Sequence, residues 1–306
     1  MLIVRQLISH GSLRRMPIRL TFKNFWSTQP DSAIRFFTDL VNTVTGQEVL
    51  LTTQSEADIT IWSVFGPNGK RNVFDGFDSR QINWYYTGEN HEPDVNFFDF
   101  SFSFSMADLE KHFRVPIWWL QCDWKREFKK ADRIENEFDP YTLHLARNLS
   151  LGSKKAISVF INNPESRRLA AIKSFESSIP VEKFGGYFDR PVPSKIESGK
   201  DYRYNLCFEN ESSPGYHTEK LLHAWAMGSV PLYFGNSTAE IEFNTKSFIN
   251  LNDFSNIKDF VSHVLTLTDE QLLEIINSPL LRAPISLDAL YSRIHLDFSE
   301  RFSKLT

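Results

Sequence analysis

The chain has 306 residues, of which 41% are hydrophobic, and its formal net charge is −4 at pH 7. This length suits two domains of ordinary size, and the slight negative charge excludes a global positive field that would attract nucleic acid or an anionic membrane. The two cysteines, Cys122 and Cys207, are far apart and form no CxxC pair, so neither a disulfide framework nor a structural zinc site is expected. No run of about 18 apolar residues is present to span a membrane.

The segment at residues 1–20 carries Arg14 and Arg15 after a few apolar residues. A secretory signal has the opposite order, basic residues first and apolar residues second. We interpret this segment as a leader into the first strand, with an amphipathic surface helix as the alternative.

The N-terminal half alternates strand and helix patterns. Strands are predicted at 17–22, 48–52, 58–65 and 81–86, and apolar residues at helical spacing predict a helix over 34–44 that ends at Gly46. Such alternation predicts a mostly parallel sheet. Aromatic residues are dense at 96–104 and 115–119, and the charged stretch at 123–150 is interpreted as the approach to a domain boundary.

The C-terminal half repeats the alternation. Strands are predicted at 156–161, 202–208, 230–234 and 248–251, and helices at 167–175 and 216–227, with Gly228 as a C-cap. Thr268 and Gln271 have the spacing of a capping box. A stripe of apolar residues from Leu290 to Leu305 predicts an amphipathic helix that packs back on the body.

These patterns predict an α/β protein with two doubly wound, Rossmann-like domains that face a cleft. The predicted domains are an N-terminal domain at 1–150 and a C-terminal domain at 151–285, followed by the amphipathic helix at 286–306. Ligands of doubly wound sheets bind at the carboxyl ends of the strands.

A lysine, Lys220, occupies the first turn of the predicted helix at 216–227, where unpaired N–H groups make a positive charge unfavourable. A bound diphosphate would turn Lys220 into a favourable partner, and the preceding Glu219 would accept hydrogen bonds from ribose hydroxyls. The pair thus fits a nucleotide-sugar site. The alternative is a surface Glu–Lys pair on a solvated helix face.

The surrounding segments have the order of a known motif. They read Phe208-Glu209-Asn210, then Tyr216-His217-Thr218-Glu219-Lys220-Leu221, then Val230-Pro231-Leu232-Tyr233-Phe234-Gly235. Together they resemble the donor-binding motif of the α1,3-fucosyltransferases of glycosyltransferase family 10, which transfer fucose from GDP-fucose. Glu211 departs from the family pattern, which has serine after Phe-Glu-Asn.

Two further segments agree with this resemblance. Tyr86-Thr87-Gly88-Glu89-Asn90, followed by Pro93-Asp94, resembles the N-terminal motif of the family. Asn163-Pro164 with Arg168, and Phe184-Gly185 later, is similar to a third family segment. The chain lacks the heptad repeats of some bacterial members and the membrane anchor of animal members. We therefore expect a bacterial, cytoplasmic member, and peripheral association with the inner membrane is left open.

The resemblance implies a GT-B type fold, with an acceptor-binding domain at 1–150 and a GDP-fucose-binding domain at 151–285. It also implies an inverting α1,3-fucosyltransferase. Such an enzyme would move L-fucose from GDP-β-L-fucose to the 3-hydroxyl of an N-acetylglucosamine or glucose unit, in an N-acetyllactosamine- or lactose-type glycan, as in Lewis-antigen synthesis. The alternatives are another GT-B nucleotide-sugar glycosyltransferase and a non-catalytic glycan-binding protein.

Site roles follow from the same resemblance. Glu89 matches the catalytic glutamate of the family and is the candidate general base; on the residues alone, a loop carboxylate that caps a helix is the alternative. The expected donor-binding residues are Arg168 and Lys220 on the diphosphate, Glu219 on the ribose, Tyr216 and Asn210 beside them, and Tyr187 near guanine.

No Asp-x-Asp triplet is present in the sequence to hold a divalent ion on the diphosphate. Cationic side chains can replace such an ion, so we expect no required metal or cofactor, and stimulation by Mn²⁺ would be compatible with this. The expected partners are GDP-fucose and an oligosaccharide acceptor, and no nucleic acid. Trp118, Trp119, Trp124 and the Phe97–Phe104 stretch are candidates to stack on the acceptor, with a place in the core as the alternative.

Overall fold

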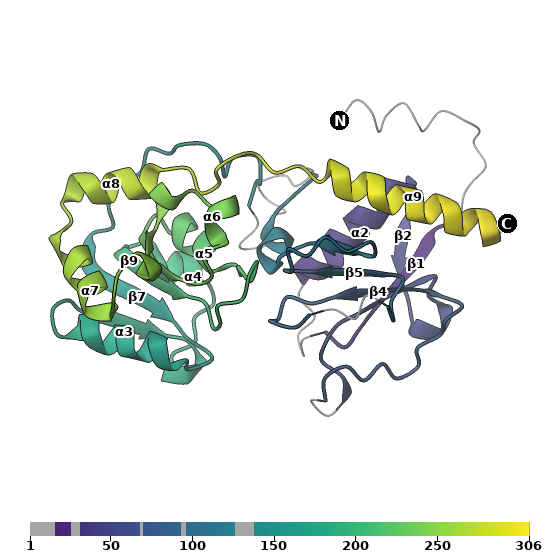
Figure 1. Cartoon of the computed structure of the whole chain (residues 1–306), viewed down its shortest axis with the longest axis horizontal. Coiled ribbons are helices and arrows are strands. Elements are labelled where there is room, and N and C mark those ends of the chain that lie inside the picture. Colours follow the sequence, from purple (N-terminus) through teal and green to yellow (C-terminus); the bar gives the residue numbers. More distant parts are fainter. Residues whose placement is uncertain (1–15, 26–30, 68–69, 93–95, 126–137, 306) are drawn as a thin grey trace. The chain divides into compact units, whose positions relative to one another are not determined.

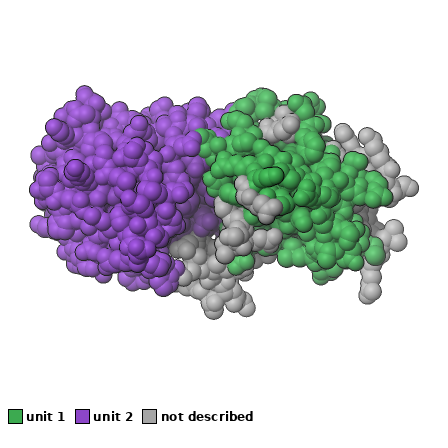
Figure 2. Space-filling view, turned by 90° about the horizontal axis from the view of Figure 1, so that it is seen from below, with its two compact units in different colours: residues 1–103, 107–115, 286–306 green, residues 104–106, 116–285 purple. Residues whose placement is uncertain are grey.

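The computed structural model describes residues 16–25, 31–67, 70–92, 96–125 and 138–305. These residues form two compact units (Figure 2): unit 1 comprises residues 1–103, 107–115 and 286–306, and unit 2 comprises residues 104–106 and 116–285. The predicted leader at 1–15 and the Pro93-Asp94 pair lie outside the described residues. Within the described part of the chain, no helix combines the length and the apolar character needed to cross a bilayer.

The two units divide the chain differently from the predicted domains 1–150 and 151–285. Residues 116–150 belong to unit 2, where the Arg147 guanidinium donates to the Trp225 carbonyl at 2.6 Å and lies 3.5 Å from the Trp225 ring centre. Residues 286–306 belong to unit 1, because the apolar face of their helix, with Leu290 and Ile294 buried, packs there.

Unit 1 contains a parallel sheet in the order β2-β1-β3-β4-β5-β6 (Figure 1). Its strands are β1 (Ile18–Lys23), β2 (Val49–Leu51), β3 (Ile59–Trp62), β4 (Ile82–Tyr86), β5 (Phe100–Ser103) and β6 (His112–Arg114). Its helices are α2 (Asp31–Thr45) and α9 (Asp288–Leu305), with a short 3₁₀ turn, η1 (Gln54–Glu56). The strands β5 and β6 were not predicted.

The two faces of this sheet are covered differently. On one face, Phe37 of α2 contacts the rings of Trp84 and Tyr86, and Phe298 of α9 contacts Trp84. On the other face, Tyr85 packs with loop aromatics, its ring centre 4.9 Å from that of Phe98. Because successive residues of a strand alternate between faces, β4 divides its aromatic side chains between a helical layer and an irregular aromatic layer.

Unit 2 contains a parallel sheet in the order β11-β10-β9-β7-β8. Its strands are β7 (Lys154–Phe160), β8 (Val181–Phe184), β9 (Tyr202–Phe208), β10 (Val230–Phe234) and β11 (Ile249–Asn250). Its helices are α3 (Ser166–Glu176), α4 (Lys195–Gly199), α5 (Lys220–Ala226), α6 (Ala239–Glu242), α7 (Ile257–Thr266) and α8 (Asp269–Asn277), with 3₁₀ turns η3 (Ile117–Gln121), η4 (Gly186–Phe188), η5 (Thr245–Ser247) and η6 (Leu251–Asp253). The strand order reverses between β7 and β9, which is the place where doubly wound sheets bind ligands.

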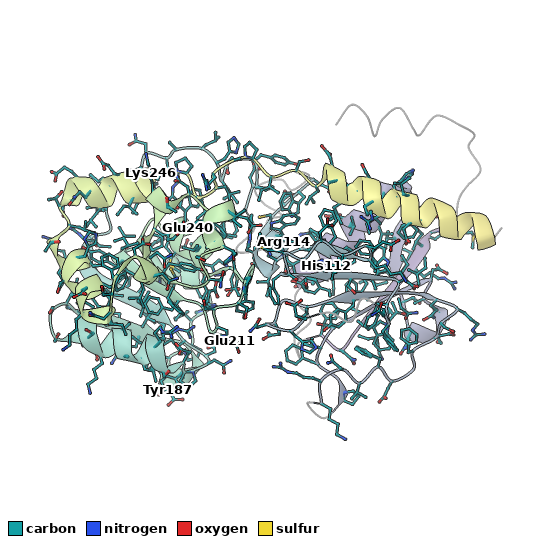
Figure 3. The ribbon with its side chains drawn as sticks, in the orientation of Figure 1. His112, Arg114, Tyr187, Glu211, Glu240 and Lys246 are labelled. Carbon is teal, nitrogen blue, oxygen red and sulfur yellow. The ribbon has the colours of Figure 1, made fainter. Side chains whose placement is uncertain are left out.

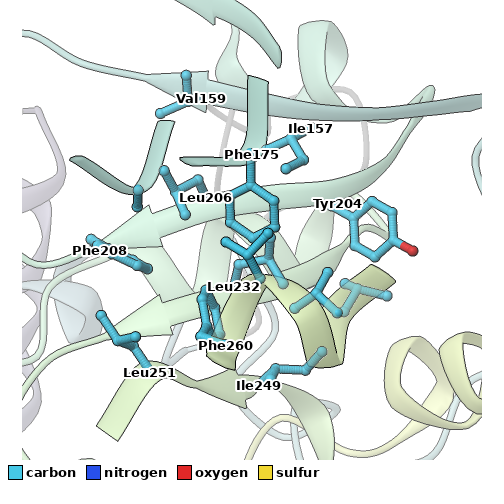
Figure 4. Close-up of a cluster of buried hydrophobic side chains, with 14 of the residues drawn as sticks. Ile157, Val159, Phe175, Tyr204, Leu206, Phe208, Leu232, Ile249, Leu251 and Phe260 are labelled. Atoms are coloured by element: carbon cyan, nitrogen blue, oxygen red, sulfur yellow. The ribbon is translucent and has the colours of Figure 1, made fainter. Parts of the chain in front are cut away.

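The core of unit 2 lies between one sheet face and the helices α3, α7 and α8 (Figure 4). Phe175 of α3 and Phe260 of α7 meet edge to face at 5.9 Å above Leu206 and Leu232 of the central strands. The helices α4 and α5 contact each other, and α5 packs on β9 and β10. All residues of β9 except Arg203 are buried, and most of them are apolar, as expected of a central strand covered on both faces.

Several predicted helix signals are confirmed. Thr268 and Gln271 form the predicted capping box at the start of α8, and Gly228 follows α5 with φ of 73°. The predicted helix at 216–227 is too long at its start, since α5 begins at Lys220. Residues 216–219 lie outside the helix instead, and the backbone N–H of Thr218 donates to the Glu209 carboxylate at 2.8 Å.

Candidate active site

The Arg168 side chain lies at the reversal point of the unit 2 sheet. Its guanidinium donates to the carbonyl of Asn163, after β7, at 3.0 Å. It also donates to the Phe208 carbonyl, at the end of β9, at 2.6 Å, and to Oδ1 of Asn210 at 2.7 Å. One side chain thus joins the carboxyl ends of the two strands that flank the expected ligand position.

Arg168 is almost fully buried, with 3% of its surface exposed. Burial lowers its pKa, although the carboxylates of Glu209 and Glu165 oppose this effect. Glu165 also caps α3, because its side chain accepts from the backbone N–H groups of Arg167 and Arg168 at 3.0 Å. The neighbouring Arg167 is exposed and lies over the Phe234 ring at 4.1 Å. The structure therefore separates the two adjacent arginines into a buried one at the site and an exposed one beside it.

The Lys220 ammonium is held by a buried carboxylate that the sequence analysis did not single out. Its Nζ donates to Oε2 of Glu209 and to Oγ1 of Thr218, both at 2.9 Å. Glu209 is only 1% exposed, and it also accepts from the Thr218 hydroxyl at 2.7 Å. Burial opposes the charged form of Lys220, but Glu209 and Glu219 outweigh it and raise the pKa of the ammonium. A positive charge at the start of α5 is thus compensated in the absence of ligand.

Glu219 directly precedes the same lysine and interacts with it electrostatically. Its Oε1 is 3.7 Å from Nζ of Lys195, on α4, and 21% of its side chain is exposed. Burial opposes ionisation, but the charges of Lys220 and Lys195 lower the pKa of the Glu219 carboxyl to about 2. Glu219 is therefore an ionised acceptor at neutral pH, as a group that binds hydroxyls must be.

Unit 2 contains a small cavity of about 40 Å³ among these charged groups, with Arg168, Lys195, Lys220 and His223 in its wall. Burial lowers the pKa of His223 to about 4, so this ring is neutral at pH 7. Its Nε2 has no hydrogen-bond partner among the described residues. Three cations and a polar nitrogen thus line one space at the carboxyl side of β9.

The remaining predicted donor residues differ in exposure. Asn210 is joined to Arg168 as described above. Tyr216 is 4% exposed, and its ring meets Phe104 edge to face at 5.3 Å. Tyr187 is 43% exposed on η4, after β8, and Figure 3 shows it on unit 2 together with Glu211, which follows β9. The structure brings Arg168, Asn210, Glu219 and Lys220 together around one strand end.

The predicted base, Glu89, lies in unit 1, after the carboxyl end of β4, and is half-buried. Its backbone N–H donates to the Thr87 hydroxyl at 3.1 Å, and its carbonyl accepts from the N–H of His91 at 2.7 Å. Thr87 is fully buried. The loop that carries the carboxylate is therefore fixed at the strand end by its own backbone.

Two other groups of residues were left with open roles. His217 is 1% exposed, and its ring nitrogens lie 3.3 Å from the Tyr233 hydroxyl and 3.1 Å from the Thr238 hydroxyl, which fits a packing role. Trp118, Trp119 and Trp124 are buried in unit 2. In the Phe97–Phe104 stretch the phenylalanines at 98, 100, 102 and 104 are buried as well, and Phe97 is 46% exposed.

Sequence reasoning missed Glu209 and Lys195. Glu209 stood within the quoted Phe-Glu-Asn segment, directly after a strand, and that position was a usable signal. Lys195 lies on the short helix α4, and its sequence neighbourhood gave no signal. In the part of the chain that the structure describes, no three His, Cys, Asp or Glu side chains are grouped so that they could hold a metal ion.

Two family models match the chain. The model described as the C-terminal domain of glycosyltransferase family 10 (fucosyltransferase) matches residues 152–273. The model described as the alpha-(1,3)-fucosyltransferase FucT N-terminal domain matches residues 20–121. Together they match the greater part of the chain, and each falls mostly within one of the two units.

Relatives with curated names agree. The alpha-(1,3)-fucosyltransferase FucT of Helicobacter pylori is 26% identical over 275 residues, which are 81% of this chain and 56% of that protein. A putative fucosyltransferase of Acanthamoeba polyphaga mimivirus is 36% identical over 35% of this chain and 18% of its own length. A 3-galactosyl-N-acetylglucosaminide 4-alpha-L-fucosyltransferase of Bos taurus is 33% identical over 39% of this chain and 34% of its own length. The chain thus spans about half the length of the first of these relatives and less of the others.

Solved structures share the fold. The crystal structure of an alpha1,3-fucosyltransferase with GDP-fucose matches with a TM-score of 0.66 and 20% identity, over 94% of this chain and 92% of that one. The structure of an alpha1,3-fucosyltransferase with GDP gives the same TM-score over 95% of this chain. The predicted α/β fold with two parallel sheets is therefore confirmed, and the chain belongs to glycosyltransferase family 10, the fucosyltransferases.

Proposed function

We propose that this chain is an inverting α1,3-fucosyltransferase. It uses GDP-β-L-fucose as donor and the 3-hydroxyl of an N-acetylglucosamine or glucose unit as acceptor, in glycans of the N-acetyllactosamine or lactose type that lead to Lewis antigens. One observation carries the proposal: the buried Arg168 and the half-buried Lys220 line the same small cavity of unit 2, at the carboxyl side of β9. Family membership and the names of the relatives support the choice of sugar.

In this proposal the reaction is one displacement at the anomeric carbon of fucose. The Glu89 carboxylate takes the proton of the acceptor hydroxyl while the oxygen of that hydroxyl bonds to the anomeric carbon. The bond from that carbon to the β-phosphate oxygen breaks on the opposite side, and its electron pair leaves with GDP. Inversion of the β-linked donor gives an α-linked product.

The unit 2 cations stabilise the negative charge that develops on the leaving diphosphate. The guanidinium of Arg168 offers five N–H donors in a planar fork, and a diphosphate oxygen competes well for those now bonded to neutral acceptors. Lys220 shares its ammonium between Glu209 and the phosphate, and Glu219 accepts from the ribose hydroxyls. Tyr216 and Asn210 border the phosphate and fucose, and the exposed Tyr187 ring borders guanine.

These cations also make a divalent ion unnecessary in the proposal. EDTA at a concentration that strips loosely bound metals is expected to leave initial rates within about twofold. A loss of activity that added Mn²⁺ restores would refute the metal-free part of the proposal, and mild stimulation of an already active enzyme by Mn²⁺ would not.

The base assignment is tested by Glu89→Gln. General-base catalysis contributes about 10²–10⁴ in rate, so we expect a loss of that size in kcat while the affinity for GDP, measured by titration calorimetry, is unchanged. The matched control is Glu56→Gln, an exposed carboxylate of unit 1 on η1. Loss of GDP binding together with turnover would count against the base role.

The donor and linkage are tested with the wild-type chain. GDP-fucose, GDP-mannose and UDP-galactose are offered separately with lactose, N-acetyllactosamine and type 1 chain acceptors, and the products are identified by NMR. Transfer from GDP-fucose alone, with an α-fucosyl product on the 3-hydroxyl, supports the proposal. A 4-linked product would move the chain toward relatives such as the Bos taurus 4-alpha-L-fucosyltransferase. We also propose that the protein is cytoplasmic, which cell fractionation of the producing organism tests.

A further inference from the structure

The loop between β9 and α5, at residues 209–219, carries Asn210 and Tyr216, two of the proposed donor contacts. Its middle, at 212–215, reads Ser-Ser-Pro-Gly, a composition typical of turns. A loop cannot rely on the repeated backbone hydrogen bonds of a helix or a sheet, so its shape depends on individual side chains that bind its backbone. The residues that bind this loop therefore decide where Tyr216 lies.

The Thr238 side chain, in the turn between β10 and α6, reaches this loop on both sides of Tyr216. Its Oγ1 accepts from the backbone N–H of Gly215 at 2.8 Å. The same oxygen lies 3.1 Å from Nε2 of the His217 ring. The residue before Tyr216 and the residue after it are thus both bound to one hydroxyl.

The direction of each hydrogen bond follows from the single proton of the Thr238 hydroxyl. This hydroxyl donates to Oδ1 of Asn236 at 3.0 Å, because a carboxamide oxygen only accepts. The Thr238 oxygen can then only accept from the His217 ring, so Nε2 of His217 carries a proton. Nδ1 of the same ring accepts from the Tyr233 hydroxyl at 3.3 Å. His217 is therefore a neutral imidazole in one defined tautomer.

The network is buried at its centre, where His217 packs edge to face on Phe243 and is 1% exposed. Burial and the Glu209 carboxylate raise the pKa of the Tyr233 hydroxyl, so this group keeps the proton that it donates. A Cβ at Gly235 would lie 2.1 Å from the Tyr233 oxygen, so glycine there leaves this hydroxyl its room. A buried polar group that loses its partner is costly, and the loop geometry thus depends on every member of the network.

We propose that Thr238 is a positioning residue of the donor site, which acts on Tyr216 through Gly215 and His217. The proposal rests on the fucosyltransfer proposed above, in which Tyr216 borders the phosphate and the fucose. The network fixes the loop before the donor binds, so less of the binding free energy is spent on ordering it. Thr238 affects the donor only through this loop.

The first test is Thr238→Val, which keeps the shape of the side chain and removes its hydroxyl. The Gly215 N–H and the His217 Nε2–H then lose their acceptor, and we expect the Kd for GDP-fucose, measured by calorimetry, to rise about tenfold. Thr238→Ser keeps the hydroxyl and should bind within about threefold of the wild type. The matched control is Ser237→Ala, at the exposed neighbouring residue, with unchanged affinity. Wild-type affinity in Thr238→Val, or no rescue by serine, would overturn the proposal.

A double-mutant cycle tests whether Thr238 acts through Tyr216. Tyr216→Phe keeps the ring that packs on Phe104 and removes the hydroxyl. In this background Thr238→Val should raise the Kd for GDP-fucose by less than about threefold, because the group that it positions is already gone. A merely structural role for Thr238 would give the same loss in both backgrounds and refute the proposal.

The ring of His217 gives a readout that does not depend on affinity. ¹⁵N NMR of the histidine-labelled wild-type chain is expected to show the proton on Nε2 at neutral pH, and this tautomer should no longer be fixed in Thr238→Val. A proton on Nδ1 alone, or a doubly protonated ring, in the wild type would contradict the network.

Binding and transfer measured on the same samples separate this proposal from the proposed function. Loss of GDP-fucose affinity in Thr238→Val and its absence in the Tyr216→Phe background, with no transfer to N-acetyllactosamine by the wild type, would refute the proposed function and leave the role of Thr238 standing. Transfer by the wild type with an unchanged KM for GDP-fucose in Thr238→Val would do the reverse. A wild-type chain that does not bind GDP-fucose would refute both.

Discussion

Replacing the buried carboxylate that holds Lys220 is the most informative single change in unit 2. Glu209→Gln keeps the size of the side chain and removes its charge. In the native chain its two oxygens accept from the Thr218 N–H at 2.8 Å, the Thr218 hydroxyl at 2.7 Å and the Lys220 ammonium at 2.9 Å. The variant leaves a positive charge beside a neutral amide whose NH₂ group also donates.

The size of the effect follows from burial. Removing one partner of a buried ion pair costs about 3–5 kcal/mol, because the other charge stays without compensation. Lys220 reaches water with 20% of its side chain, whereas the Glu209 side chain is 1% exposed. Glutamine also keeps one acceptor oxygen for Thr218. We therefore expect the free energy of unfolding of unit 2 to fall by about 2 kcal/mol at pH 7.

The assay is urea unfolding followed by two probes, because the two units need not unfold together. The control is Glu197→Gln, whose partner Lys200 is 54% exposed; a surface pair of this kind is worth about 0–1 kcal/mol. The same variants are titrated with GDP, and Glu209→Gln is expected to bind it with changed affinity, since Lys220 loses its fixed position. A Glu209→Gln chain as stable as Glu197→Gln, with unchanged GDP affinity, would refute the reasoning.

The pH dependence gives an independent check on the same pair. Although burial opposes it, Glu209 and Glu219 raise the pKa of Lys220 in the folded chain. A raised lysine pKa stabilises the fold fully below the unfolded value of about 10.4, and this stabilisation is lost as the pH rises through the folded value. The difference between wild type and Glu209→Gln should therefore stay constant from about pH 6 to pH 9 and shrink only at higher pH.

Three further changes test other parts of the site. The pKa of the Glu219 carboxyl is lowered to about 2 in the folded chain, so its ionised form stabilises the fold fully above the pKa of the unfolded chain, and this stabilisation is lost as the pH falls toward 2. The wild type should therefore lose on the order of 3 kcal/mol of unfolding free energy over this acidic range, and Glu219→Gln should not show this loss. Unfolding measured at a series of pH values tests this. Gly185 has φ of 105°, and a Cβ there would lie 2.2 Å from the Ile161 carbonyl oxygen, so Gly185→Ala should cost at least about 2 kcal/mol, whereas Gly186→Ala, whose nearest atom is at 3.5 Å, should be tolerated in the same thermal-unfolding experiment. Arg168→Lys cannot reproduce three hydrogen bonds from one planar group, and calorimetry should show GDP affinity reduced at least about tenfold; wild-type affinity in this variant would contradict a diphosphate role.

Much of the fold could be predicted because its signals are local. Gly46 and Gly228 have φ of 67° and 73°, a conformation that favours glycine, so each marks a real helix end. The strands β5, β6 and β8 escaped prediction because they are only three or four residues long, and β6 and β8 are also only partly buried. The start of α5 was misplaced for a related reason, since a carboxylate nine residues earlier holds the backbone of Thr218 out of the helix.

Most residues of the candidate site could be predicted from the sequence, but the hydrogen bonds and ion pairs among them could not. The resemblance pointed to Arg168, and the structure shows that it is buried while Arg167 is exposed. The sequence presented Lys220 as a charge that needed a ligand, whereas the structure shows that Glu209 already compensates it. Contacts of this kind join residues that are distant in the sequence, so the spacing of residues along the chain does not reveal them.

The return of residues 286–306 to unit 1 has a consequence for how the protein is made. Nearly all of unit 2 is contained between two stretches of unit 1, and α9 supplies Leu290, Ile294 and Phe298 to cover α2 and the first sheet. During synthesis, which proceeds from the N-terminus, unit 2 has its whole sequence available before unit 1 receives α9. Until residues 288–305 have been translated, the face of the first sheet that α9 covers lacks this helix, so the aromatic residues of that face are the surface that a chaperone would meet on the nascent chain.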